Sequence, residues 1–180
     1  MSKKLGRCAT SNSKDWCTPP RIVNAVRKFF GGSIGLDPCS NPHSSVGAEH
    51  SFVPPTYNGL ALPWDIGNHK VFVNPPYGRD SEHGSSIYDW VKKCSDSYTE
   101  CGCEVIALIP VATNTAHWKE YVFPTAAAIC FLKDTRLKFY ENGMESKKGA
   151  PMACALVYWG TNAYEFDRVF ETDFGNVVYL

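Results

Sequence analysis

The sequence lacks several features that would place a protein in a class at once. It has no excess charge of either sign, because 18 lysines and arginines balance 18 aspartates and glutamates. Any contact with nucleic acid must therefore come from a local basic surface. No apolar run is long enough to cross a membrane, and none follows the basic residues of MSKKLGRCATSNSKD. We expect a cytoplasmic protein without a membrane contact or a signal peptide.

The eight cysteines lack the spacing of a metal site. No C-x-x-C pair occurs, the closest pair is Cys101 and Cys103, and the five histidines show no ligand spacing relative to the cysteines. In the absence of an export signal, reduced thiols that partly fill the core are favoured over disulfides. We therefore expect no bound metal.

Neither internal repeats nor low-complexity tracts occur, and 180 residues suffice for one well-buried domain but hardly for two. The apolar content of 44% and charged content of 20% are typical of a soluble globular protein. We interpret residues 1–12 as a flexible lead-in and residues 13–180 as a single domain.

The apolar pattern predicts an α/β domain. Helical spacing over Ile22 to Phe30, after two prolines and before two glycines, predicts a first helix, and others are expected over residues 87–102 and 115–121. Short apolar runs predict strands at SIGLD, KVFVN, EVIALIP and AAAICFL, with a further short one around residues 50–53. Their alternation with helices predicts a mostly parallel sheet with an antiparallel edge, and TRLKFY with MACALVYWG predicts a C-terminal antiparallel hairpin.

The stretch VFVNPPYGR ends a predicted strand on four residues of distinct chemistry. Pro75 and Pro76 cannot donate to a strand ladder, and they leave backbone carbonyls free to accept hydrogen bonds. Asn74 adds a further acceptor oxygen and Tyr77 a flat aromatic face. Such a site would hold a planar –NH₂ group by its two hydrogens and localise the nitrogen lone pair for attack, without acting as a base. A plain end of a strand is the alternative.

Asp37 and Asn74 each follow a predicted strand. In α/β sheets, ligands bind beyond the carboxyl ends of the strands, so we expect both residues beside one site.

Asn74-Pro75-Pro76-Tyr77 resembles motif IV, (D/N/S)PP(Y/F/W), of the S-adenosylmethionine-dependent amino-methyltransferases. Other segments follow in that family's order. DWCTPP resembles the W-x-T-P-P segment of phage-type DNA N6-adenine methyltransferases of the Dam group, LDPCS their motif I, and NGLALPW the spacer before motif IV. ALIP, FLKDTRLKF and GAPMACALVYWG resemble the later strands, so the similarity covers about residues 13–160. The sequence departs from the family's usual pattern at two places. In motif I, the glycine-rich turn is replaced by Pro38-Cys39-Ser40, as in the phage branch. In the spacer, the position where an aspartate is common is occupied by Asn58.

This resemblance implies a Rossmann-like methyltransferase fold, with a mostly parallel twisted sheet flanked by helices. It implies methyl transfer from S-adenosylmethionine to the N6 amine of adenine in double-stranded DNA, with the base flipped into a pocket. Asn74 and the Pro75 carbonyl would hold the amine, Pro76 would stiffen the turn, and Tyr77 would stack on the base. If the chain is phage-encoded, it would act in the cytoplasm of a bacterial host.

The resemblance also supplies binding residues. Asp37 would face the positively charged methionyl part of the cofactor, and Glu49 would face the ribose. The full set of expected cofactor-binding residues is Trp16, Thr18, Pro19, Asp37, Pro38, Cys39, Asn74 and Glu49. The DNA contacts are expected from charge and position instead. Basic residues flank the proposed pocket or lie in the predicted hairpin, namely Arg79, Arg136, Lys138, Lys147 and Lys148, and their binding to DNA would depend on salt. Ser85 and Ser86, in the loop after motif IV, would help close the site over the flipped base. The alternatives are a turn cap for Asp37, a core role for Trp16, and solvated surface positions for Glu49 and the cations.

Other activities remain open at this point. Cytosine N4, RNA adenine and a protein glutamine carry planar amines of the same kind. Enzymes for cytosine N4 more often have Ser at the position of Asn74, and those for glutamine usually add a helical domain and a glycine-rich motif I. A non-catalytic nucleic-acid-binding protein that retains the fold is the alternative from another class.

Overall fold

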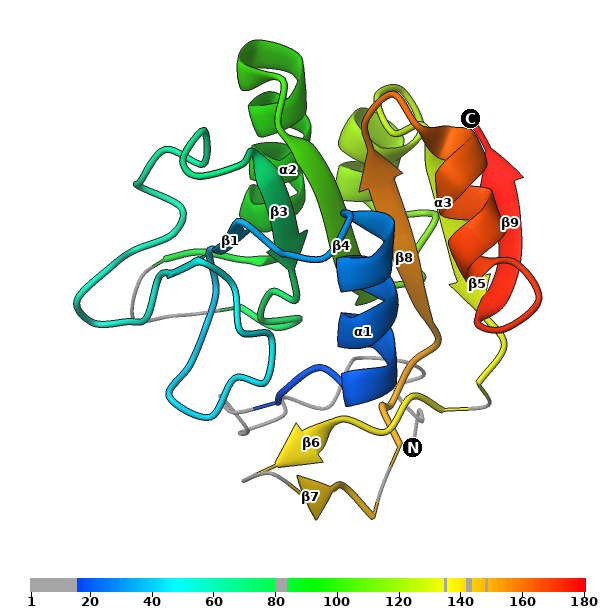
Figure 1. The fold of residues 1–180 in the computed structure, drawn as a ribbon, viewed down its shortest axis with the longest axis horizontal. Coiled ribbons are helices and arrows are strands. Elements are labelled where there is room, and N and C mark those ends of the chain that lie inside the picture. The colour runs from blue at the N-terminus through cyan, green and yellow to red at the C-terminus, as the bar shows by residue number, and fades with distance from the viewer. Residues whose placement is uncertain (1–15, 80–83, 135, 142–143, 148) are drawn as a thin grey trace, which may run out of the picture.

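The fold is that of a computed structural model, which describes residues 16–79, 84–134, 136–141, 144–147 and 149–180. A central sheet of seven strands runs in the order β2-β1-β3-β4-β8-β5-β9, with helices on both faces (Figure 1). Its strands are β1 Leu36–Asp37, β2 His50–Ser51, β3 Lys70–Val73, β4 Glu104–Pro110, β5 Ala128–Leu132, β8 Cys154–Trp159 and β9 Gly175–Tyr179. The expected α/β class is thereby confirmed.

Strands β2, β1, β3 and β4 are parallel neighbours, with Leu36 opposite Val71 and Val71 opposite Val105. Strand β8 pairs antiparallel with both β4 and β5, so β4 and β5 run the same way. Strand β9 pairs antiparallel with β5 at the edge. We call the edge where β1, β3 and β4 end the carboxyl edge.

The helices are α1 Pro20–Phe29, α2 Ile87–Cys101, the π-helix η1 Trp118–Val122 and α3 Ala163–Phe170. A proline in the first turn of α1 costs no hydrogen bond, and Ser86 with Asp89 forms a capping box at the start of α2. Gly102 closes α2 with φ at 68°, a conformation that favours glycine. The first two expected helices are confirmed, and the third begins later than predicted.

Successive residues of β4 point to opposite faces of the sheet, as a pleated strand requires. Ile106 and Leu108 pack in one core with α1 and α3, whereas Val105, Ala107 and Ile109 pack in another with α2 and η1. The sheet is therefore covered on both faces, which explains why EVIALIP is an uninterrupted apolar run.

The C-terminal hairpin differs from the expectation. It consists of β6 Tyr140–Glu141 and β7 Met144–Glu145, a separate two-stranded sheet, and β8 is no part of it. All six residues of β8 are buried, so this strand lies in the interior of the main sheet, between β4 and β5, and not at an antiparallel edge. A strand that is apolar at every position is stable only where both faces are covered. Neither α3 nor β9 was predicted from the sequence.

Four cysteines are free and buried, in agreement with the expected core thiols: Cys94, Cys103, Cys130 and Cys154.

In the described ranges, none of the helices has the length and apolar character needed to cross a bilayer. No group of three or more metal-ligating side chains occurs in the same ranges. The predicted lead-in of residues 1–12 lies outside the described residues, and the single domain stays a prediction.

Candidate active site

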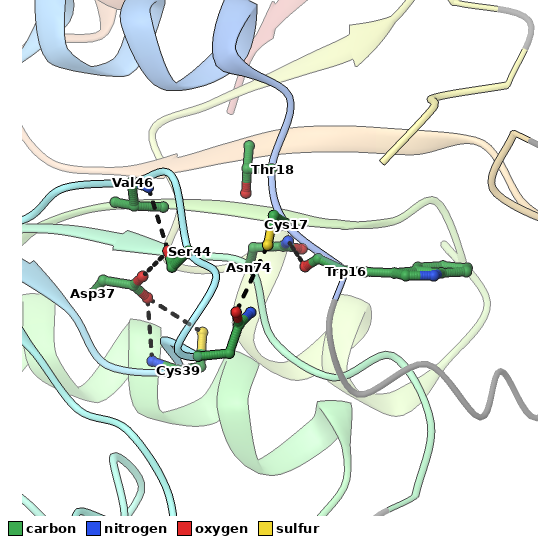
Figure 2. A pocket seen from close by; sticks show the side chains of 9 residues that line it. Trp16, Cys17, Thr18, Asp37, Cys39, Ser44, Val46 and Asn74 are labelled. Carbon is green, nitrogen blue, oxygen red and sulfur yellow. Dashed lines mark hydrogen bonds between the residues drawn. The ribbon is translucent and has the colours of Figure 1, made fainter. Parts of the chain in front are cut away.

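The carboxyl edge brings together three segments that are far apart in the sequence. Asp37 ends β1, Asn74 follows the neighbouring strand β3, and residues 16–19 cross the same edge before α1 begins. We call residues 16–19 the strap. Figure 2 shows the pocket that these segments share. It is lined by Trp16, Cys17, Thr18, Asp37, Cys39, Asn41, Ser44, Val46 and Asn74.

Asp37 is a buried acid that has no cationic partner among the described residues. Its side chain is 4% exposed, and no ion pair in the described part of the chain includes it. Its oxygens accept hydrogen bonds from the Cys39 N–H at 3.3 Å and the Ser44 hydroxyl at 3.1 Å. Burial raises its pKa to about 6, although these hydrogen bonds lower it. Asp37 thus caps a turn and also presents a carboxylate to the pocket, where a positive ligand would compensate its burial.

Thr18 carries a buried hydroxyl for which the described part of the chain offers no hydrogen-bond partner. The residue is 2% exposed, and its Oγ1 has no partner among the residues that the structure describes. Figure 2 shows this hydroxyl on the pocket side of the strap. An unsatisfied buried hydroxyl costs about 1–3 kcal/mol, so this position is suited to a ligand that supplies the missing partner.

The side-chain amide of Asn74 has a defined orientation. Its Nδ2 donates to the backbone carbonyl of Trp16 at 3.4 Å, and a carbonyl can only accept. The Oδ1 atom is therefore left as an acceptor, and no described donor binds it. The Pro75 carbonyl likewise accepts no hydrogen bond within the described ranges. Pro75 is buried, whereas Pro76 is exposed.

Tyr77 and Trp16 are held by the same neighbour, Phe139. The Tyr77 hydroxyl donates to the Leu108 carbonyl at 3.2 Å, and its ring meets Phe139 edge-on with centroids 5.9 Å apart. The Trp16 indole stacks on Phe139 at 5.0 Å and donates to Glu141 at 2.8 Å. Figure 2 shows this indole extending away from Asp37 and Ser44, so Trp16 borders the pocket through its main chain. Its ring has the packing role that was the alternative prediction.

The spacer before motif IV supports the turn after β1. A Cβ on Gly59 would lie 1.8 Å from the Pro38 carbonyl oxygen, so only glycine allows this approach. The Trp64 indole in turn donates to the Gly59 carbonyl at 2.8 Å. Asn58 accepts from the Leu60 N–H at 3.0 Å and so closes its own turn. It is not among the residues that line the pocket with Asp37.

One known protein family matches most of the chain. The model of the family described as DNA N-6-adenine-methyltransferase (Dam) matches residues 7–170. The chain belongs to the Dam family. No curated protein and no solved structure matches it.

Membership of the Dam family implies DNA adenine N6 methyltransferase activity, with DNA as the substrate. It confirms the resemblance found from the ordered motifs, and it favours adenine over cytosine N4 and protein glutamine as the methylated group.

One predicted residue of this Dam-family chain lies far from the pocket. Glu49 precedes β2 and accepts from the Asn68 side chain at 3.1 Å, beside the start of β3. A residue that precedes a parallel strand lies at the opposite edge from one that follows it. The sequence position already carried this information, because Glu49 comes before the predicted strand of residues 50–53. Glu49 is therefore not among the residues that line the pocket, and its contact with the ribose stays a prediction.

Two further predicted residues support the pocket without lining it. Pro19 is the N-cap of α1 and is buried. Pro38 is buried and contacts Gly59. Cys39 does line the pocket, and burial raises the pKa of its thiol. It is therefore a neutral pocket wall and not a reactive thiolate.

The predicted DNA contacts lie near the carboxyl edge of the Dam-family fold. Arg79 is exposed after Tyr77, and Ser85 directly precedes the N-cap of α2. The exposed residues Arg136, Lys138 and Lys147 flank the β6–β7 hairpin, which Figure 1 places beyond that edge. Lys138 lies 3.8 Å from Glu145, an exposed pair of little energetic weight. Lys148 lies outside the described residues.

Four residues line the pocket without having been predicted from the sequence: Cys17, Asn41, Ser44 and Val46. Three of them come from residues 41–68, which had no periodicity to orient a side chain. Ser44 connects the pocket wall, since it donates to Asp37 and accepts from the Val46 N–H at 3.3 Å. Cys17 could have been inferred only from its position between Trp16 and Thr18.

Proposed function

We propose that this chain transfers the methyl group of S-adenosylmethionine to the N6 amine of adenine in double-stranded DNA, at the carboxyl edge. The observation that supports the proposal best is the shared pocket of Asp37 and Asn74. One residue offers a buried carboxylate for a positive cofactor, and the other an oriented amide oxygen for an –NH₂ group. The two follow adjacent parallel strands, so they are held in fixed relation.

The polar groups of the pocket suit this cofactor. S-adenosylmethionine carries positive charge, which Asp37 would compensate, and polar groups that could satisfy the Thr18 hydroxyl. When bound, it supplies an electrophilic methyl carbon on a positively charged sulfur. The described pocket has a volume of only about 10 Å³, room for about one water molecule, whereas sites for small molecules measure about 300–1,000 Å³. The strap and residues 39–46 would therefore move apart to admit the cofactor.

Motif IV would hold the target amine. The Asn74 Oδ1 and the Pro75 carbonyl would accept the two N6 hydrogens and localise the nitrogen lone pair. Tyr77 would contact the base ring, which must leave the duplex at a cost of a few kcal/mol. The nitrogen would gain the methyl group as the bond between that carbon and the sulfur breaks, which would leave S-adenosylhomocysteine as the second product. One N6 proton would leave for solvent, because the neutral Asn74 amide is not a base.

DNA binding would use the cations near the carboxyl edge. Arg79, Arg136, Lys138, Lys147 and Lys148 would contact phosphates, and Ser85 would help close the site over the flipped base. A bacterial cytoplasm, during phage infection, is the compartment that we propose for the reaction.

Incubation of the purified protein with methyl-labelled S-adenosylmethionine and PCR-amplified duplex DNA is expected to label the DNA. Digestion to nucleosides and mass spectrometry should then identify N6-methyladenosine in its deoxy form. Parallel reactions with RNA, and with the DNA already methylated to completion, serve as controls. Label found only in deoxycytidine, in RNA or in protein would contradict the proposal.

Replacement of Thr18 by valine is expected to weaken cofactor binding by about tenfold, because it removes the hydroxyl but keeps the shape of the side chain. The same change should leave the melting temperature unchanged or raise it, since an unsatisfied buried polar group disappears. Isothermal titration with S-adenosylhomocysteine and a thermal melt measure the two effects. Thr18→Ser, which keeps the hydroxyl, is the matched control, and a Thr18→Val protein with wild-type affinity would show that the hydroxyl does not serve the cofactor.

A further inference from the structure

Phe139 lies at a junction between the strap and motif IV. Its side chain is 2% exposed and packs between two rings, stacked against Trp16 with an interplanar angle of 13° and edge-on against Tyr77 at 71°. Both arrangements are favoured geometries for aromatic pairs. Sequence alone suggested no role for Phe139, which stands in a segment that resembles only a closing strand.

The backbone fixes Phe139 relative to the strap. Cys17 donates its N–H to the Tyr140 carbonyl at 2.9 Å, and Tyr140 donates its N–H to the Cys17 carbonyl at 3.0 Å. Trp16 and Phe139 each directly precede a member of this pair, so their backbones are held in register. Their stacked rings therefore move with the strap, which also covers the pocket.

Two residues of motif IV depend on this junction. The ring of Tyr77 is held at one end by its hydrogen bond to the Leu108 carbonyl and at its side by Phe139. The amide of Asn74 is oriented by the carbonyl of Trp16. Without Phe139, the Tyr77 ring would lose its edge-on contact and keep the hydrogen bond to the Leu108 carbonyl, and the strap would lose the stack that fixes Trp16.

We infer that Phe139 is a positioning residue, which sets the Tyr77 ring against the target base according to the position of the strap. The inference rests on the proposed function. Phe139 does not line the cofactor pocket, and the backbone hydrogen bonds between Cys17 and Tyr140 hold the strap without its ring, so its loss is expected to affect the placement of the base more than cofactor affinity. Small displacements of a positioned group cost large factors in rate.

Phe139→Leu is expected to lower kcat for methyl transfer at least about tenfold, with KM for S-adenosylmethionine within about threefold of wild type. Trp16→Leu removes the other partner of the stack, so the double variant should lose little more than the worse single variant. The control is Phe166→Leu, which removes a ring from the same core but away from the strap and motif IV. Phe166 stacks on Tyr158, and the Tyr158 hydroxyl donates to Glu104 at the start of β4. Its effect should be small and should multiply with that of Phe139→Leu.

Rates are normalised to the fraction of protein that binds S-adenosylhomocysteine, and Phe139→Met replaces Phe139→Leu if the latter does not fold. Three results would overturn the inference while the wild type remains active. They are a normal kcat in Phe139→Leu, a rise in KM that accounts for the loss of rate, and single effects that multiply in the Trp16/Phe139 double variant. A wild type that transfers no methyl group would remove the proposed function together with the inference.

Discussion

Replacement of Asn74 by alanine is expected to lower kcat for methyl transfer by about 100- to 1,000-fold, the usual cost of losing one preorganised hydrogen-bonding group that serves a transition state. The amide Oδ1 is left as an acceptor because Nδ2 is bonded to the Trp16 carbonyl. The target amine would then keep one acceptor, the Pro75 carbonyl, and its lone pair would stay delocalised. Steady-state assays on duplex DNA measure kcat.

Cofactor affinity separates a chemical role of Asn74 from a structural one. The 3.4 Å bond to Trp16 is long, so its loss should change the dissociation constant of S-adenosylhomocysteine by no more than about threefold. Asn74→Asp, which keeps an acceptor oxygen at the same place, is the matched variant and should retain more activity than Asn74→Ala. Equal losses of rate and of cofactor affinity in Asn74→Ala would mean that Asn74 supports the fold of the pocket instead.

Replacement of Asp37 by asparagine is expected to weaken S-adenosylmethionine binding by about 100-fold at pH 8, because the shape of the side chain is kept and its charge is lost. The affinity of the wild type should fall as the pH drops below about 6, by up to tenfold per pH unit, since the carboxylate becomes protonated there. The affinity of the variant should be nearly independent of pH in this range. Calorimetric titrations between pH 5 and pH 8 test both statements.

The same substitution has the opposite effect on the free protein. The pKa of Asp37 is about 6 when folded against an ordinary value of 3.8, so the wild type loses stability as the pH rises through this window. The difference corresponds to about 3 kcal/mol at pH 8. Asp37→Asn should therefore be more stable than the wild type at pH 8, with the advantage gone near pH 4. A variant that is less stable at pH 8 would show that the carboxylate is compensated inside the fold.

The parts of the fold that follow from local pattern could be read from the sequence. Helix α1 has apolar residues at helical spacing between prolines and glycines. Asn74 to Tyr77 combine two prolines that stop a strand with an amide and an aromatic ring, which are suited to binding a ligand. These features depend on neighbours in sequence. Strand β8 shows the limit, because its uniformly apolar residues indicate burial on both faces but do not say which strands flank it.

The wall of the pocket depends on contacts between distant residues. Ser44 and Val46 belong to an irregular segment, and only the turn at Asp37 brings them to the carboxyl edge. Phe139 acquires its place from the pairing of Cys17 with Tyr140, across more than 120 residues. Glu49 is not part of this wall, because it precedes β2 and so lies at the edge of the sheet where the parallel strands begin.

A crystal structure of the protein with S-adenosylhomocysteine tests the central claim most directly. The account predicts that the ligand occupies an opened form of the pocket under the strap. Its amino group should lie beside the Asp37 carboxylate and its sulfur on the side of Asn74, with the Asn74 Oδ1 facing open space large enough for a purine. A ligand bound away from the carboxyl edge, or an Asn74 side chain turned away from the ligand, would contradict it.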